Sequence, residues 1–155
     1  MQIDEMVTAV QTLNGEDAYR ARLNVGQWRL VSAYLTRHEI PAGGSLIRQN
    51  DNDRVMYFIE SGSFQVFVNA REGLRGRVAI LRPGAAVGEP SLFIDRPRMA
   101  NVEAMMPSVV WALPATRFEE LAVRQPELAL ELLRAAGAMM AVRMRMNLER
   151  GIPMS

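Results

Sequence analysis

The chain has 155 residues, of which 49% are hydrophobic, and its 18 basic and 17 acidic residues give a formal net charge of +1. It contains no cysteine, no lysine and one histidine. This composition excludes disulfides, cysteine-ligated metal clusters, histidine-rich metal centres and a lysine-dependent phosphate loop. The balanced charge gives no electrostatic footprint for nucleic acid. No apolar run is long enough to span a bilayer, and the acidic N-terminus lacks a signal-peptide pattern, so we expect a cytoplasmic, single-domain protein.

The first 37 residues show helical spacing of their apolar side chains. Helices are predicted over residues 3–13, 17–23 and 27–37. The sequence Pro41-Ala42-Gly43-Gly44 then ends the helical pattern. His38 follows the third predicted helix, and a lone histidine without cysteine partners is a poor metal site, so we expect it to be structural.

Residues 38–114 have a different texture, with short apolar or alternating runs separated by turn residues. The runs are Leu46–Ile47, Met56–Ile59, Phe64–Val68, Val78–Leu81 and Val109–Leu113. Short strands at this spacing are typical of an antiparallel sandwich or barrel. A hairpin loop is predicted over 69–76, and the only helical interruption is expected at 89–94.

Helical spacing returns over residues 115–150, as one helix at 115–124 and a longer one at 126–150 that begins with Pro126. The longer helix has an apolar stripe with heptad spacing: Leu128, Leu132, Ala135, Met139, Val142 and Met146. A second stripe runs beside it: Ala129, Leu133, Ala136 and Met140. A helix that is apolar on two sides must be covered on two sides. We therefore predict a homodimer through the heptad stripe. The alternative is a single wide face packed on its own domain.

The segment 87–101 carries the residue types needed to hold a sugar phosphate. A glycine turn at Gly88 leads into a short helical segment, and free backbone N–H groups at a helix start attract anions. Arg98 follows Glu89 by nine residues. A guanidinium can pair with two phosphate oxygens, and a carboxylate can accept hydrogen bonds from ribose hydroxyls.

In this order, the motifs of the chain resemble those of a cyclic nucleotide-binding domain, and most closely the sensor half of the bacterial catabolite activator and fumarate–nitrate regulator superfamily. The resemblance covers roughly residues 27–150. It is carried by Pro41-Ala42-Gly43, Gln49-Asn50-Asp51, Tyr57–Gly62, Leu81–Gly84, Gly88-Glu89 and Pro97–Ala100. It implies a mainly β fold with flanking helices: a jelly-roll-like β-roll (a double-stranded β-helix) of about eight strands, N-terminal helices at 1–37, and C-terminal helices at 115–150.

The resemblance also implies roles for individual residues. Arg98 would pair with the cyclic phosphate and Glu89 with the ribose 2′-hydroxyl. The ligand would approach the backbone of Gly88 and Ser91, while Ala100 would pack beneath. Three further residues complete the expected site: Pro90, Met99 and Arg143. Pro90 and Met99 depart from the family pattern, and Arg143 would stack on the base from the long helix.

Three of these residues also have a plain structural alternative. Arg98 alone would be read as a surface arginine paired with Asp95 or Glu103. Glu89 would be read as a helix cap. Arg143 would be read as a solvated arginine near a helix end.

The predicted function is a non-enzymatic regulatory sensor of a 3′,5′-cyclic purine nucleotide, cAMP before cGMP, with no cofactor or metal. It would signal through the C-terminal helix to a dimer interface or a protein partner. No DNA-binding domain is expected after residue 150, so no direct DNA contact is predicted. The alternative is a degenerate fold that dimerises or docks without nucleotide, which Pro90 and Met99 favour. A cupin-type enzyme is disfavoured because its metal site usually needs several histidines.

Overall fold

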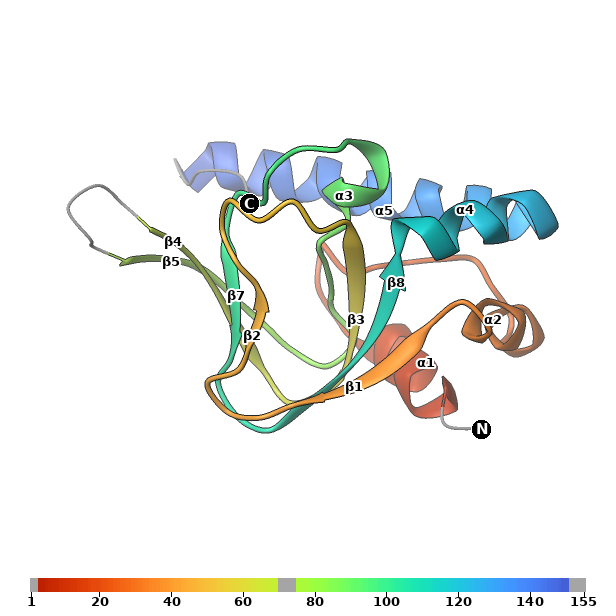
Figure 1. Cartoon of the computed structure of the whole chain (residues 1–155), viewed down its shortest axis with the longest axis horizontal. Helices are drawn as coiled ribbons and strands as arrows, with labels where there is room; N and C mark the ends of the chain where they lie inside the picture. Colours follow the sequence, from red (N-terminus) through yellow and green to blue (C-terminus); the bar gives the residue numbers. More distant parts are fainter. Residues whose placement is uncertain (1–2, 70–74, 151–155) are drawn as a thin grey trace.

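Eight strands lie between two N-terminal helices and a long C-terminal helix in the computed structural model, which describes residues 3–69 and 75–150 (Figure 1). The helices are α1 (Ile3–Thr12), α2 (Val25–Ser32), α3 (Pro90–Phe93), α4 (Ala115–Arg124) and α5 (Pro126–Arg150). The strands are β1 (Thr36–Ile40), β2 (Ser45–Ile47), β3 (Val55–Ser61), β4 (Phe64–Asn69), β5 (Arg75–Leu81), β6 (Ala86–Val87), β7 (Asn101–Ala104) and β8 (Ser108–Pro114).

The strands form two four-stranded antiparallel sheets, in the orders β1-β8-β3-β6 and β2-β7-β4-β5. Alternate side chains of each strand point between the sheets, as the two-residue period requires. Phe64 and Val66 from β4 meet Ile59 and Val110 from the other sheet in this inner core. The predicted β-roll with flanking helices is therefore confirmed. Residues 70–74 of the predicted hairpin loop lie outside the described residues.

The helices cover the outer face of the β1-β8-β3-β6 sheet and build a second core there. Phe58 of β3 is fully buried, with the rings of Tyr19 and Trp28 edge-on to it at centroid distances of 5.2 and 5.8 Å. Leu132 of α5 is buried in the same cluster. This core fixes α5 against the β-roll. None of the described helices is both long and apolar enough to cross a bilayer.

The N-terminal helices differ from the prediction. Residues 17–23 are not helical, and α2 covers 25–32 instead of 27–37. The earlier start has a local cause: the Asn24 side chain accepts from the Gln27 N–H at 2.8 Å while the Gln27 side chain accepts from the Asn24 N–H at 2.9 Å. This capping box fixes the helix start at Val25. The segment between α1 and α2 is instead irregular and runs toward α5 (Figure 1).

Three strands were not recognised in the sequence. The stretch 36–37, predicted as helix, begins β1, which pairs with β8 along its length. His38 is therefore exposed in the middle of a strand and not at a helix end. Strands β6 and β7 have two and four residues. Such short strands are too brief to show a period, and tertiary pairing decides them.

Helix α5 has the predicted extent, but its heptad stripe is not a free surface. Leu128, Leu132, Ala135 and Met139 are all at most 6% exposed within the single chain. Ala129 and Ala136 of the second stripe are buried beside them. Val142 and Met146 are half-buried. The predicted dimer seam is thus wrong for most of its residues, because the two stripes form one wide face packed on the chain's own core.

Replacement of Leu132 by alanine tests this assignment of the helix faces. Loss of a fully buried leucine should lower the free energy of unfolding by about 2–5 kcal/mol. Leu130, on the same helix, is 68% exposed, so Leu130→Ala should change it by less than about 0.5 kcal/mol. Denaturant unfolding of both variants measures the difference. Equal costs would show that the buried face has been misassigned.

Candidate ligand-binding site

The site is built on the tight connection between β6 and α3. Gly88 has a φ of +82°, and a Cβ there would lie 2.6 Å from the Val55 carbonyl oxygen and 3.0 Å from Arg98 Nη1. Only glycine fits both the backbone conformation and this close approach. Ser91 donates from its hydroxyl to the Gly88 carbonyl at 2.7 Å, and Arg54 donates from Nε to the Ser91 carbonyl at 3.0 Å. Together these bonds hold the short helix α3 in place.

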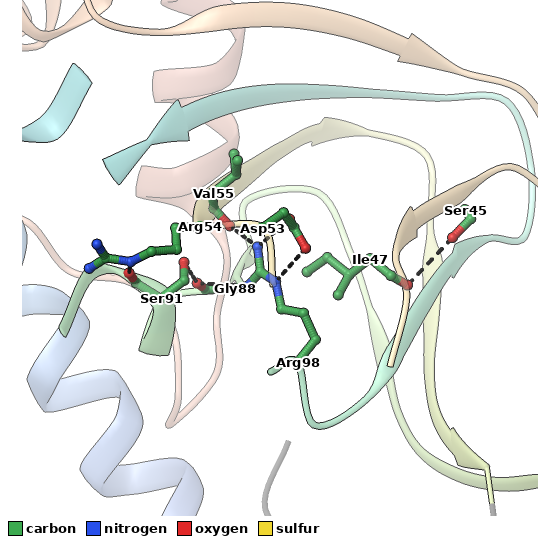
Figure 2. A network of polar contacts seen from close by, with 8 residues as sticks. All are labelled: Ser45, Ile47, Asp53, Arg54, Val55, Gly88, Ser91 and Arg98. Carbon is green, nitrogen blue, oxygen red and sulfur yellow. Dashed lines mark hydrogen bonds and ion pairs between the residues drawn. The ribbon is translucent and has the colours of Figure 1, made fainter. Parts of the chain in front are cut away.

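Arg98 is buried beneath this turn and points toward the start of β3 (Figure 2). Its guanidinium forms a fork with Asp53, with Nε donating to Oδ1 at 3.1 Å and Nη2 donating to Oδ2 at 2.8 Å. Nη2 also donates to the Val55 carbonyl at 2.6 Å, and Nη1 donates to the Gly88 carbonyl at 3.2 Å. An arginine carries five N–H donors. These four bonds therefore leave one donor, on Nη1, without a partner among the described residues.

The carboxylate that pairs with Arg98 is neither of the two that the sequence suggested. Neither Asp95 nor Glu103 contacts it in the described residues; Asp53, 45 residues earlier in the chain, does. The bidentate geometry is that of the stronger arginine–carboxylate pairs. A guanidinium held on several sides keeps one orientation, which is what recognition of a phosphate by a fork requires.

Glu89 is the buried carboxylate of the site, with 4% of its surface exposed. Its side chain does not cap helix α3. One oxygen, Oε1, accepts a hydrogen bond from Arg143 Nη1 at 3.0 Å. The other oxygen, Oε2, is buried and has no hydrogen-bond partner among the described residues. A buried oxygen without a donor is costly, so such a group calls for an explanation such as a ligand.

Burial also shifts the protonation equilibrium of Glu89. Desolvation raises the pKa of this carboxyl, and the positive charge of Arg143 opposes the rise. The rise in pKa disfavours the ionised form, in which one buried oxygen has no donor. A hydroxyl donor from a bound molecule would favour the ionised form.

Arg143 reaches the site from helix α5. Besides Glu89, its guanidinium donates to Asp17 Oδ2 at 3.1 Å and to the Ala86 carbonyl at 2.8 Å. Its side chain is 18% exposed. Arg143 is thus neither a solvated helix-end residue nor free to cover a ligand in this arrangement.

A cavity of about 70 Å³ lies between these groups. Its charged lining is three arginines (Arg96, Arg98 and Arg143) and one carboxylate (Glu89), which favours an anion. Most of the remaining lining is apolar, formed by Ile47, Val66, Val87, Ile94, Pro97, Met99, Ala100 and Val102. Pockets that enclose small molecules usually measure about 300–1,000 Å³. The site is therefore narrow, and a ligand of nucleotide size needs it to open.

The eight site residues predicted from the sequence all line this one cavity: Gly88, Glu89, Pro90, Ser91, Arg98, Met99, Ala100 and Arg143. The sequence did not indicate Asp53 or Asp17, which hold the two arginines. Asp53 stands in a run of turn residues, and Asp17 was assigned to a helix. No local pattern distinguishes either from a surface carboxylate.

The described residues contain no group of three or more histidine, cysteine, aspartate or glutamate side chains placed to hold a metal ion. The charged groups that line the cavity are three arginines, of which Arg98 and Arg143 are held by hydrogen bonds, and one carboxylate. This donor set is suited to an organic anion with hydroxyl groups.

Several curated proteins with similar sequences are regulatory subunits of cAMP-dependent protein kinases. The chain is 30% identical over 118 residues to a cAMP-dependent protein kinase regulatory subunit of Blastocladiella emersonii, covering 76% of this chain and 29% of that subunit. It is 28% identical over 127 residues to the corresponding subunit of Aspergillus fumigatus, again covering 76% of the chain and 31% of the relative. The chain thus spans less than a third of these relatives' length.

Solved structures agree on the fold. A cyclic nucleotide-binding domain from Methylobacillus flagellatus superposes with a TM-score of 0.83 at 19% identity, covering 96% of this chain and 82% of that one. The catabolite activator protein of Thermus thermophilus gives 0.74 at 27% identity, covering 84% and 60%. The sequence model described as "Cyclic nucleotide-binding domain" matches residues 37–125. That segment contains both sheets and residues 87–101, here called the cassette, with Glu89 and Arg98. The chain therefore belongs to the cyclic nucleotide-binding domain family.

Proposed function

We propose that this chain is a non-enzymatic sensor that binds a 3′,5′-cyclic purine nucleotide, cAMP before cGMP. The observation that carries the proposal is the pairing, in one cavity, of a fixed guanidinium at Arg98 with a buried, partnerless carboxylate oxygen at Glu89. Relatives named as cAMP-dependent regulatory subunits support the choice of cAMP.

Arg98 supplies the phosphate contact in this proposal. The cyclic phosphate carries one negative charge, and the free donor on Nη1 lies beside the Gly88 turn, which has no side chain to block approach. Asp53 acts as a positioning residue that fixes the guanidinium plane. Because Asp53 is also a competing anion, a bound phosphate must share the arginine with it or displace it.

Glu89 supplies the ribose contact. Its Oε2 atom lacks a donor, and the ribose 2′-hydroxyl would provide one. The apolar wall gives the ribose and base a dry surface. Met99, 52% exposed at the cavity, has no hydroxyl to bind the exocyclic amine of guanine, which favours adenine.

Ligand entry is coupled to helix α5 through the size of the cavity. A space of about 70 Å³ cannot enclose a nucleotide, so the binding-competent form is an opened arrangement of lower population. A ligand that binds this form better shifts the population toward it. Arg143 ties α5 to Glu89, so α5 is the element expected to move and to carry the signal to a dimer interface or partner.

A docking module without nucleotide is the second candidate. The observation that favours it is that Arg98 and Arg143 are both bonded to groups of the protein itself. The two candidates differ in one thermal-shift experiment: added cAMP raises the melting temperature of a sensor and leaves that of a docking module unchanged.

Substitution of Arg98 by alanine tests the phosphate contact. The variant should lose about 2–5 kcal/mol of cAMP binding free energy, because a desolvated phosphate would lack its cation. Isothermal titration calorimetry on nucleotide-free protein measures the loss, with circular dichroism to verify folding. Arg98→Lys keeps the positive charge but lacks the fork, so its affinity for cAMP should lie between those of the wild type and Arg98→Ala. Arg124→Ala, at an exposed helix end, is the control. Wild-type affinity in Arg98→Ala would refute the assignment.

Substitution of Glu89 by glutamine, combined with 2′-deoxy-cAMP, tests the ribose contact. In the wild type the 2′-hydroxyl bonds to a charged acceptor, so cAMP should bind more tightly than its 2′-deoxy analogue by about 1.5–3 kcal/mol. In Glu89→Gln the acceptor is neutral, and the difference should shrink to about 0.5–1.5 kcal/mol. Comparing two ligands within each variant cancels general effects of the substitution. If the difference between the two ligands were the same in Glu89→Gln as in the wild type, the 2′-hydroxyl would not bind Glu89.

A further inference from the structure

We propose that Asp17 is a positioning residue for Arg143, and that the segment carrying it restrains the ligand site in its narrow form. This N-terminal strap is defined as residues 13–24, the irregular segment between α1 and α2. The inference rests on the proposed function in that the restrained site is the cyclic nucleotide cavity. The strap lies outside residues 37–125, the segment that matches the family, and would control the cavity from there.

The strap is hydrogen-bonded to helix α5 at four points. Its bonds to the helix are Tyr19 Oη to the Leu132 carbonyl (2.9 Å), the Arg22 N–H to Glu131 Oε2 (2.6 Å), Arg134 Nη2 to the Arg20 carbonyl (2.9 Å), and Arg143 Nε to Asp17 Oδ2 (3.1 Å). The first three lie on one half of α5. Asp17 is the contact that reaches the half of the helix that faces the cavity.

Arg143 holds three separate parts of the molecule together. Its guanidinium binds Asp17 of the strap, Glu89 of the cassette and the carbonyl of Ala86 in β6. It also lines the cavity and a second hollow of about 200 Å³, which Asp17 lines too. Arg143 thus lines both spaces, and its Nε is hydrogen-bonded to Asp17, which lines the second one.

The contact with Glu89 gives the restraint its consequence. Arg143 donates to one oxygen of Glu89, which is the only acidic side chain among the described residues that line the cavity. The space is too small for a nucleotide. A ligand that opens the cavity must loosen this arrangement and therefore works against the Asp17–Arg143 pair. An interaction present mainly in the closed form lowers the apparent affinity by its contribution to that form. Loss of the Asp17–Arg143 pair should therefore tighten nucleotide binding and lower the stability of the ligand-free protein.

Asp17→Asn is the variant that isolates this restraint, since it leaves Arg143, Glu89 and every other cavity residue in place. The pair is partly exposed, with 39% of the Asp17 side chain accessible. Its loss should therefore change the equilibrium constant between the closed and opened forms of the site by about two- to fivefold. Calorimetry should show cAMP binding about two- to fivefold tighter than in the wild type, together with a lower melting temperature of the ligand-free protein. A merely structural role would lower stability without tightening binding.

Glu16→Gln is the matched control. Glu16 is exposed, precedes Asp17 in the same strap and has no ion-pair partner among the described residues. It removes the same charge from the same segment, so it separates the specific pair from a general change in the electrostatic field. Equal affinities for the two variants, or weaker binding by Asp17→Asn, would overturn the proposal.

A second measurement needs no nucleotide. Hydrogen exchange of the ligand-free protein should be about two- to fivefold faster in Asp17→Asn than in Glu16→Gln for amides of α5 beyond Met139 and of the turn from Ala86 to Phe93. Unchanged exchange overturns the restraint. Because this readout is independent of ligand, failure of the wild type to bind cAMP would count against the proposed function, whereas the exchange data judge the restraint itself.

Discussion

The arrangement of this protein depends on one buried carboxylate. Glu89 is almost wholly removed from solvent, one of its oxygens is paired with Arg143, and the other has no donor among the described residues. A buried charge is tolerated only where cations and hydrogen bonds compensate it. The compensation here is incomplete, and the residue that lacks a donor lines a cavity. Glu89 therefore connects three parts of the site: it belongs to the cassette, it is paired with Arg143 of the long helix, and it is the proposed acceptor for the ligand.

The two arginines of the site are held in different ways, which gives them different tasks. Arg98 is fixed by a carboxylate fork and two carbonyl groups within the β-roll and cassette, so it offers a rigid cation. Arg143 extends from the last third of a helix and is bonded to the strap, β6 and the cassette. A rigid cation suits recognition, whereas a cation that bridges separate elements suits the transmission of a change in position. The proposed sensor uses both.

The features of the site that are local in sequence could be predicted, and those that depend on tertiary contacts could not. The glycine turn, Glu89 and Arg98 fall within one short segment, so their common site was evident from spacing and from the family resemblance. Asp17 lies 126 residues from its partner Arg143, and no local pattern joins them. Part of the strap carries apolar residues at helical spacing, yet the strap is irregular, and the Asn24–Gln27 capping box starts the next helix only at Val25. The stripes of α5 showed that the helix is covered, but only packing revealed that its own domain covers it.

A crystal structure of the chain with cAMP would locate the ligand and both proposed contacts. We expect one nucleotide in the cavity beside Gly88, with its phosphate on Arg98 and its 2′-hydroxyl within hydrogen-bond distance of Glu89 Oε2. We also expect that the contact between Arg143 and Asp17 is lengthened or broken. A nucleotide bound elsewhere, or one that leaves Oε2 still without a donor, would contradict the account.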